Sequence, residues 1–329
     1  MTPSQPLRSV ALLAVGLLPG CMTLEAFVFN GVPCTEVGPE TCEEVDDPWG
    51  KLCVPCDEPY DWGKDYPWMD GTLAAGQTIR PVPEALVTQY TVPTDDGEGA
   101  IDAWLLRSHG EDPRLSTTTI LYNHGNYASI EHYQPRARML YEAGYNVLIW
   151  DYRGYGKTTP HEHPTPEQFM DDAQTVRRWS RSVVPDPSRT VIYGYSLGGL
   201  PAVEMATASP GCALVLEAPF SSFEQIVEAN TSLSLGERFF SEGRFDNIEK
   251  IATLDAPLLV MVGTEDRTTP ETAVREVFEA APQPKELWVL PGVAHGIRGG
   301  GVPEAGLDTY LDRIDAFLTR EAAGCVLDL

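Results

Sequence analysis

The chain has 329 residues, of which 43% are hydrophobic and 22% are charged, so it is long enough to bury a large core. Its formal net charge is -25 at pH 7. This charge excludes nucleic acid as an expected partner, because phosphate binding needs a basic surface. We interpret the acidic excess as a feature that keeps the protein soluble.

Residues 1–20 are expected to form an export signal. Arg8 precedes an apolar run at 10–18, which is too short to cross a bilayer of about 30 Å as a helix. The run ends in Leu18-Pro19-Gly20-Cys21, which resembles the lipobox of bacterial lipoproteins. The resemblance implies lipidation of Cys21 and an exported protein that is lipid-anchored to the membrane of the bacterial cell envelope, on the periplasmic or outer-membrane face. Simple secretion is the alternative.

Residues 21–85 are expected to form a Cys-rich, loop-rich segment. Beyond Cys21 the chain has six cysteines, and an even set in an exported protein suggests disulfides. The candidates are Cys34, Cys42, Cys53, Cys56, Cys212 and Cys325. The first four allow three pairings, among which the sequence does not choose. A zinc site is the rival interpretation, but only Cys53 and Cys56 have the close spacing of a zinc motif. A redox role for that pair lacks a strand-to-helix context.

Aromatic residues are also frequent in this segment: Trp49, Trp62, Tyr66 and Trp68. They could form a binding surface. We expect them instead to pack against the following domain, because so short a segment buries little area by itself.

Residues 86–329 are expected to form a single α/β domain. Alternating patterns at 86–92 and 100–107 flank a turn and predict a β-hairpin. Further strands are predicted at 118–122, 146–150, 190–193, 213–217, 257–262 and 286–290, and helices at 131–142, 166–182, 197–209, 271–281 and 304–322. Apolar strands alternating with helices predict a mostly parallel, eight-stranded sheet with helices on both faces.

One stretch, 219–256, interrupts this alternation after the sixth predicted strand. It contains no strand pattern and reads as one or two short helices. A small cap over a pocket is one interpretation, and an ordinary long crossover is the other.

The segment "TVIYGYSLGGLP" places Ser196 between Gly194 and Gly198. A predicted strand ends just before the serine and a predicted helix begins just after it, so Ser196 lies on a sharp turn. Side chains at the two glycine positions would collide with the neighbouring strand and helix. The turn exposes Oγ above the sheet, near the positive end of a helix. This pattern predicts a nucleophile.

A serine nucleophile needs a base and a residue that orients the base. His295 lies in a glycine-rich loop after the last predicted strand, whereas the other histidines, at 109, 124, 132, 161 and 163, have less suitable positions. Asp266 follows the preceding strand, at the same edge of the sheet, and is the expected acid. Glu265 and Glu217 are the alternative acids.

An oxyanion hole requires two donors. The backbone N–H of Leu197, directly after the nucleophile, is one candidate. The other is the backbone N–H of Asn126 in the loop "YNHGNYAS", where His124 and Gly125 are expected to shape the turn.

Six motifs carry a family resemblance: "NHGN", "DYRGYGKT", "GYSLGG", "EAPFSS", "GTEDRTTP" and "AHG". Over about residues 86–323 the chain resembles the α/β-hydrolase superfamily, and it is similar to small-cap serine hydrolases of the depalmitoylase, monoacylglycerol-lipase and serine-aminopeptidase types. The resemblance implies the α/β-hydrolase fold, and the chain order of Ser196, Asp266 and His295 is that of its triad. It also implies that Arg153 is a buried organiser of hydrogen bonds.

We therefore expect a serine hydrolase that cleaves a carboxylic ester or thioester of a small-molecule or lipid-like acyl substrate, through an acyl-enzyme intermediate. Nothing in this chemistry requires a metal or cofactor. A serine-aminopeptidase-like peptidase is the second interpretation, with acidic clusters such as "FMDD" binding a free amine. A catalytically inactive hydrolase fold that binds a partner at the cell surface is the third.

Overall fold

The computed structural model describes residues 28–34, 55–63, 79–222, 225–226, 246–296 and 306–327. Its strands are β1 (Val87–Pro93), β2 (Ala100–Leu106), β3 (Thr119–Asn123), β4 (Asn146–Trp150), β5 (Thr190–Tyr195), β6 (Ala213–Glu217), β7 (Leu258–Gly263) and β8 (Lys285–Leu290). The α-helices are α2 (Ile130–Glu142), α3 (Pro166–Ser180), α4 (Gly199–Ala208), α6 (Asn247–Ile251), α7 (Glu271–Ala280) and α8 (Leu307–Glu321). None of the helices within these ranges combines the length and hydropathy that a membrane span requires.

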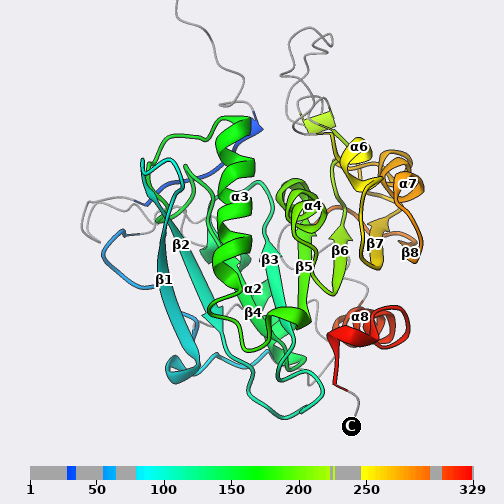
Figure 1. Ribbon diagram of the computed structural model, residues 1–329, viewed down its shortest axis with the longest axis horizontal. Helices are drawn as coiled ribbons and strands as arrows, with labels where there is room; N and C mark the ends of the chain where they lie inside the picture. The colour runs from blue at the N-terminus through cyan, green and yellow to red at the C-terminus, as the bar shows by residue number, and fades with distance from the viewer. Residues whose placement is uncertain are drawn as a thin grey trace, which may run out of the picture.

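All eight strands form one twisted sheet in the order β1-β2-β4-β3-β5-β6-β7-β8 (Figure 1). β1 pairs antiparallel with β2, and β2 pairs antiparallel with β4. Every remaining pair is parallel. The predicted mostly parallel, eight-stranded sheet is confirmed, and so is the hairpin at its start.

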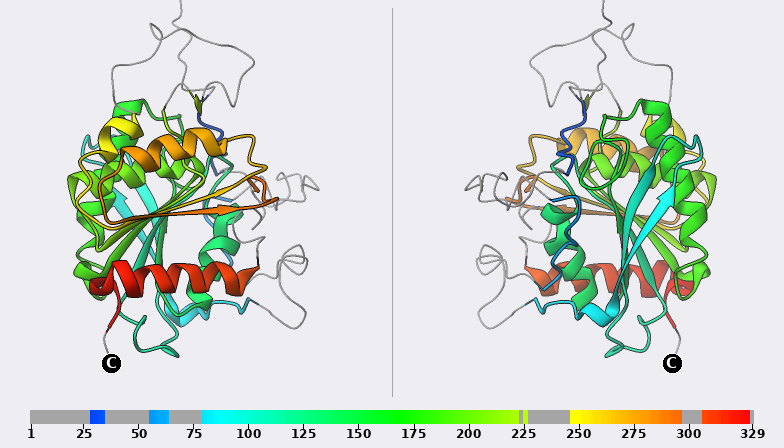
Figure 2. Two further views of the ribbon diagram at one scale, coloured as in Figure 1. Left: turned by 90° about the vertical axis from the view of Figure 1, so that its right-hand side faces the viewer. Right: turned by 90° about the vertical axis from the view of Figure 1, so that its left-hand side faces the viewer.

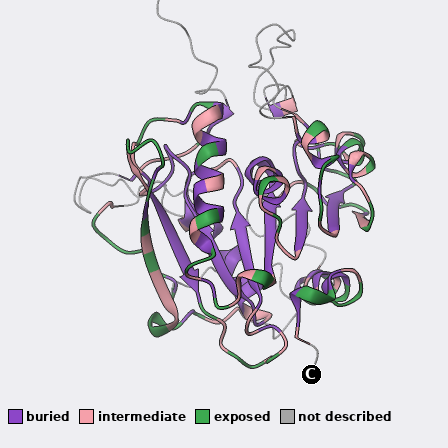
Figure 3. Ribbon diagram, viewed as in Figure 1, coloured by how far each residue is buried: buried purple, intermediate pink, exposed green. Residues whose placement is uncertain are grey.

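Helices cover both faces of the sheet, so the protein has two apolar cores. One core contains buried residues of α2 and α8, and the other contains buried residues of α3, α4, α6 and α7. Figure 2 shows α7 and α8 on opposite sides of the sheet. Successive β3 side chains alternate between the cores: Ile120 and Tyr122 face one, and Leu121 faces the other. β3 to β7 are buried throughout, while the edge strand β1 is partly exposed (Figure 3).

The observed elements follow the predicted ones closely, with two differences at the central turn. β5 continues two residues beyond its predicted end, because its pairing with β6 extends to Tyr195 opposite Glu217. The helix predicted from Leu197 begins at Gly199 instead, since 196–198 form the tighter 3₁₀ turn η4 (Ser196–Gly198). α3 begins as predicted: Thr165 and Gln168 form a reciprocal capping box.

The described parts of the Cys-rich segment pack against the sheet domain. Trp62 is buried and lies 6.1 Å from Trp104, measured between ring centroids. Tyr60 is also buried, 5.5 Å from the same tryptophan. The prediction that the aromatic residues pack on the domain is thus confirmed for Trp62, while Trp49, Tyr66 and Trp68 lie outside the described residues.

Two disulfides are present among the described residues: Cys34 with Cys56, and Cys212 with Cys325. Of the three pairings that the first four cysteines allow, the structure has the one in which Cys34 is bonded to Cys56. His161 lies close to these two sulfurs, but the sulfurs are bonded to each other and are not the thiolates that zinc binds. Cys21, Cys42 and Cys53 lie outside the described residues. So do 223–224 and 227–245, which together make up more than half of the predicted cap.

Candidate active site

Ser196 occupies a strained turn between β5 and α4. Its φ is +54°, a left-handed conformation that is uncommon for residues other than glycine. The turn is tight on both sides: a Cβ on Gly194 would lie 2.5 Å from the carbonyl oxygen of Gly198, and a Cβ on Gly198 would lie 2.1 Å from that of Asn123. Both flanking glycines are therefore required for this geometry.

The structure brings Ser196, His295 and Asp266 into one hydrogen-bonded chain. His295 Nε2 lies 2.9 Å from Ser196 Oγ, and His295 Nδ1 lies 2.7 Å from Asp266 Oδ2. The three residues follow β5, β8 and β7, whose carboxyl ends meet at one edge of the sheet. The Asp266 side chain is 1% exposed and the His295 side chain 14%, so the imidazole is the more accessible member of the pair.

The Asp266 carboxylate is fixed by the loop that follows it. Its Oδ1 accepts hydrogen bonds from the backbone N–H groups of Thr268 and Thr269, at 2.9 and 2.8 Å. The Thr269 hydroxyl donates to Oδ2 at 2.9 Å. Glu265 is exposed and makes no described contact with His295. The alternative acid at position 265 is therefore not in the place that the imidazole requires.

Glu217, the other alternative acid, has a different partner. Its carboxylate accepts two hydrogen bonds from Arg136 Nη1, at 2.9 and 3.0 Å, with both side chains buried. Tyr193 donates a further hydrogen bond at 2.6 Å. Burial by itself lowers the pKa of Arg136, but the charge and hydrogen bond of Glu217, together with Tyr195 and Tyr122, raise that pKa well above its usual value. Glu217 is thus part of a buried ion pair.

The Arg136–Glu217 ion pair also contacts the loop that carries His295. Arg136 Nη2 donates to the carbonyl oxygen of Gly296 at 3.0 Å. Its guanidinium lies 3.8 Å from the centroid of the Tyr195 ring, and the Tyr195 hydroxyl donates to the carbonyl oxygens of His295 and Gly296, at 3.0 and 2.5 Å. The Tyr195 and His295 rings stack with centroids 5.4 Å apart. Arg136 and Tyr195 therefore fix the backbone that carries the imidazole.

The loop after β3 lies beside the serine turn, as expected. His124 is fully buried, with Nδ1 2.8 Å from the carbonyl oxygen of Gly125 and Nε2 3.3 Å from Asp151 Oδ1. These contacts suit a residue that shapes the loop. Asn126 follows directly, and Leu197 lies at the start of the helical turn. The two expected oxyanion donors are thus on adjacent loops.

The remaining histidines take no part in this chain of contacts. His109 Nε2 lies 3.2 Å from the carbonyl oxygen of Glu142. His132 is buried in α2, and His163 packs 6.4 Å from the Phe29 ring. His161 lies near the Cys34–Cys56 disulfide.

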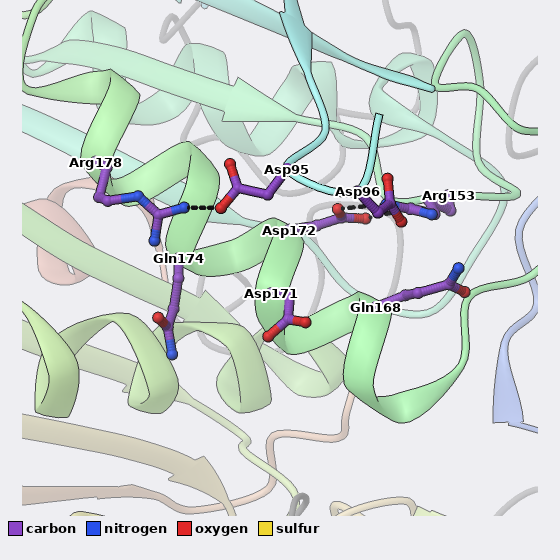
Figure 4. A pocket seen from close by; sticks show the side chains of 8 residues that line it. All are labelled: Asp95, Asp96, Arg153, Gln168, Asp171, Asp172, Gln174 and Arg178. Atoms are coloured by element: carbon purple, nitrogen blue, oxygen red, sulfur yellow. Dashed lines mark hydrogen bonds and ion pairs between the residues drawn. The ribbon is translucent and has the colours of Figure 1, made fainter. Parts of the chain in front are cut away.

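Arg153 is buried at 2% exposure and binds Asp172 through two hydrogen bonds, at 2.7 and 3.0 Å. Asp96 pairs with the same guanidinium at 2.7 Å. These residues line a pocket of about 250 Å³ between the β1–β2 turn and α3 (Figure 4). Ser196, Asp266 and His295 do not line this pocket. Asp172 is one of the two aspartates of "FMDD", the cluster expected to bind a free amine in the peptidase interpretation, and its carboxylate is bound to Arg153.

Sequence reasoning missed three residues that organise the site: Thr269, Arg136 and Tyr195. Thr269 lies three residues after Asp266, a spacing at which a hydroxyl can reach back to a carboxylate. Tyr195 directly precedes the nucleophile and could have been suspected from that position. Arg136 is a helical arginine far away in sequence, and no local signal marks it.

The arrangement contains the parts that nucleophilic catalysis needs. A hydroxyl is hydrogen-bonded to an imidazole, and the imidazole is oriented by a buried carboxylate. The serine also lies at the start of a helical segment, where backbone N–H groups and the helix dipole favour negative charge.

Comparison with known proteins supports a hydrolase. The family described as serine aminopeptidase, S33 matches residues 116–245. The chain is similar to an uncharacterized protein of Mycobacterium tuberculosis, with 34% identity over 210 residues that cover 63% of this chain and 72% of the relative. It is also similar to α/β hydrolase domain-containing protein 17B of Xenopus tropicalis, with 27% identity over 62% of this chain and 67% of the relative.

Solved structures share the fold. The esterase Pf2001 of Pyrococcus furiosus aligns with a TM-score of 0.58 and 22% identity, over 76% of this chain and 96% of the esterase. An acylaminoacyl peptidase of Pyrococcus horikoshii aligns with a TM-score of 0.53 and 17% identity, over 72% of this chain and 42% of the peptidase.

Proposed function

The chain belongs to the α/β-hydrolase superfamily, and we propose that it is a serine hydrolase that cleaves carboxylic ester or thioester bonds of small-molecule or lipid-like acyl substrates. Ser196 is the nucleophile, His295 the general base and Asp266 the residue that orients the imidazole. The observation that carries the proposal is the continuous pair of hydrogen bonds at 2.9 and 2.7 Å between these three side chains.

The reaction proceeds in two halves. In the first, Ser196 Oγ bonds to the acyl carbon while His295 Nε2 takes the hydroxyl proton, and His295 then gives that proton to the departing alcohol or thiol. In the second, water attacks the acyl-enzyme, His295 accepts its proton, and the proton returns to Ser196 Oγ as the carboxylic acid leaves. The backbone N–H groups of Leu197 and Asn126 bind the oxyanion in both halves. Each donor lowers the activation free energy by about 2.7 to 4 kcal/mol.

Esters are favoured over amides because alcohols leave more readily than amines. A peptidase remains the second candidate, since the matching family is described as serine aminopeptidase. Against it stands the pairing of Asp172 with Arg153, which occupies a carboxylate that could have bound a free amine.

Hydrolysis of p-nitrophenyl esters, from acetate to palmitate, tests the proposal. Ser196→Ala and His295→Ala should reduce kcat by about 10⁵ to 10⁶, and Asp266→Asn by about 10⁴. The profile over chain length reports the size of the acyl pocket. Amino-acid p-nitroanilides serve as the amide substrates. Cleavage of anilides alone would favour the peptidase, and cleavage of neither class would favour a non-catalytic binding protein.

We also propose that the protein is exported and anchored through Cys21. The Cys34–Cys56 and Cys212–Cys325 disulfides are compatible with an oxidising compartment. Incorporation of labelled palmitate into the chain in bacterial cells, with Cys21→Ser as control, tests the anchor. Label that persists in Cys21→Ser would contradict lipidation at this cysteine.

A further inference from the structure

Residues 28–34, here called the N-terminal clasp, lie along the loop that carries Asn126. The backbone N–H of Ala128 donates to the Asn30 carbonyl at 3.1 Å, and the N–H of Val32 donates back to the Ala128 carbonyl at 2.9 Å. On its other side the clasp accepts a hydrogen bond at Val32 from the backbone N–H of Gly156, at 2.9 Å. The clasp thus joins the loop after β3 to the loop after β4.

The Asn126 side chain is held by the same segment. Its amide nitrogen donates to the Val28 carbonyl at 2.5 Å, and its Oδ1 accepts from the backbone N–H of Asn30 at 2.9 Å. The Tyr155 hydroxyl donates to the same oxygen at 2.5 Å. Two of these three contacts come from the clasp, and they fix the residue whose backbone N–H we assign to the oxyanion hole.

The loop conformation itself needs external support. Ala128 has a φ of +52°, and a non-glycine residue keeps such a strained conformation only where its surroundings over-determine it. The two backbone hydrogen bonds to the clasp supply that constraint. Without them, Ala128 is free to relax to negative φ and to carry the adjacent backbone with it.

Both ends of the clasp are anchored. Val28 and Phe29 are buried in the domain core, and the Phe29 ring meets the Phe169 ring edge-on at 5.2 Å between centroids. At the other end, Cys34 is covalently joined to Cys56, and its backbone N–H donates to the carbonyl of Gly156 at 2.6 Å.

We infer that the N-terminal clasp is a positioning element for the second oxyanion donor, and that the Cys34–Cys56 disulfide keeps it in place. This inference rests on the proposed function. An oxyanion hole accelerates a reaction because its donors are already oriented toward the oxyanion position before charge develops there. The clasp affects catalysis only by positioning the backbone N–H of Asn126. The active form of the protein is therefore the oxidised form.

Two independent variants loosen the clasp. In Gly31→Ala, the new Cβ would lie 2.3 Å from the carbonyl oxygen of Gly154 and 2.5 Å from the Tyr155 ring, so the segment must move. Its control is Gly324→Ala, where no described atom lies within 4 Å. In Cys34→Ser/Cys56→Ser the covalent anchor is lost. Its control is Cys212→Ser/Cys325→Ser, which removes the disulfide that ties the start of β6 to the chain end.

The readouts are kcat and KM for p-nitrophenyl acetate, and hydrogen exchange of a peptide covering 124–130. Loss of a full oxyanion donor costs about 10² to 10³ in kcat, so a misaimed donor should cost at least about tenfold, with KM within about twofold. Both clasp variants should also exchange faster at 124–130. Neither control should change kcat by more than about twofold at temperatures where it is folded.

Three results would overturn the inference: unchanged kcat in both clasp variants, unchanged exchange at 124–130, or an equal loss of kcat in the controls. If Gly31→Ala does not fold, Cys34→Ser/Cys56→Ser and wild-type protein treated with a thiol reductant decide the question. If the wild-type protein cleaves no ester, the proposed function fails. Unchanged exchange in the clasp variants then still refutes the clasp separately.

Discussion

Replacing Arg136 by methionine should destabilise the protein and slow its reaction, for two separable reasons. The substitution leaves the Glu217 carboxylate, whose side chain is 1% exposed, without its cation. It also removes the donor to the Gly296 carbonyl behind His295. Methionine is close to arginine in length and fills the space of its stem, so the charge and the hydrogen bonds are the main losses.

The size of the effect follows from these contacts. Breaking a buried ion pair by removing one partner costs about 3 to 5 kcal/mol. The Tyr193 hydroxyl still donates to Glu217, which places the expected loss near the lower end, but the contact of the guanidinium with the Tyr195 ring is lost as well, at about 2 kcal/mol for a desolvated pair. We expect a loss of about 5 kcal/mol, or roughly 10 °C in Tm.

Urea unfolding and p-nitrophenyl acetate hydrolysis measure the two effects. The double variant Arg136→Met/Glu217→Gln removes the orphaned charge while keeping an acceptor for Tyr193, so it should recover at least about 2 kcal/mol. Its kcat should remain low, because the Gly296 carbonyl still lacks its donor. Arg136→Lys controls for charge, since lysine cannot hold Glu217 and Gly296 with one planar group.

The reasoning is wrong if Arg136→Met costs less than about 1 kcal/mol, or if the double variant is no more stable than the single one. Full recovery of kcat in the double variant would leave the ion pair a purely structural feature.

Three further predictions concern other parts of the molecule. Thr269→Val removes the hydroxyl that donates to Asp266 Oδ2 and should lower kcat about tenfold with little change in KM, because a hydrogen bond to a charged group contributes about 1.5 to 3 kcal/mol; unchanged kcat would refute this role. Burial raises the pKa of Asp102 to about 6 from its ordinary value of 3.8. Stability from this group is therefore present below about pH 4 and lost as pH rises through 6, so between pH 5 and 8 the unfolding free energy of wild type should fall by about 1.4 kcal/mol more than that of Asp102→Asn. Equal slopes would contradict this. The Cys212–Cys325 disulfide spans 113 residues and Cys34–Cys56 spans 22, so by loop entropy their removal should cost about 5 and about 3 kcal/mol; denaturant unfolding of the two double serine variants should show this order.

The positions of Ser196, Asp266 and His295 were predictable because the sequence patterns that mark them are local. The glycines at 194 and 198 mark a turn that only small residues fit, and β5, which leads into this turn, is mainly apolar. Asp266 follows the apolar strand β7, His295 follows the more polar strand β8, and parallel strands bring their carboxyl ends to one edge of the sheet. Connectivity and strand polarity therefore suffice to bring these three residues together.

The supports of the site could not be predicted in this way. Glu217 also ends a central strand, and the sequence allowed it as an acid, but in the folded protein it meets Arg136 from α2, a contact between residues 81 positions apart. Likewise, the choice of Cys56 as the partner of Cys34 depends on where the clasp lies over the loops at 126 and 156.

The sequence by itself determined the sheet, the serine turn and the chain order of Ser196, Asp266 and His295, because strand periodicity and glycine sterics act over a few neighbouring residues. Only the tertiary structure decided which acid faces the imidazole, what holds the His295 loop and where residues 28–34 lie. Those outcomes depend on the packing of side chains from distant segments, in which burial makes each polar group bind whichever partner the fold brings within about 3 Å.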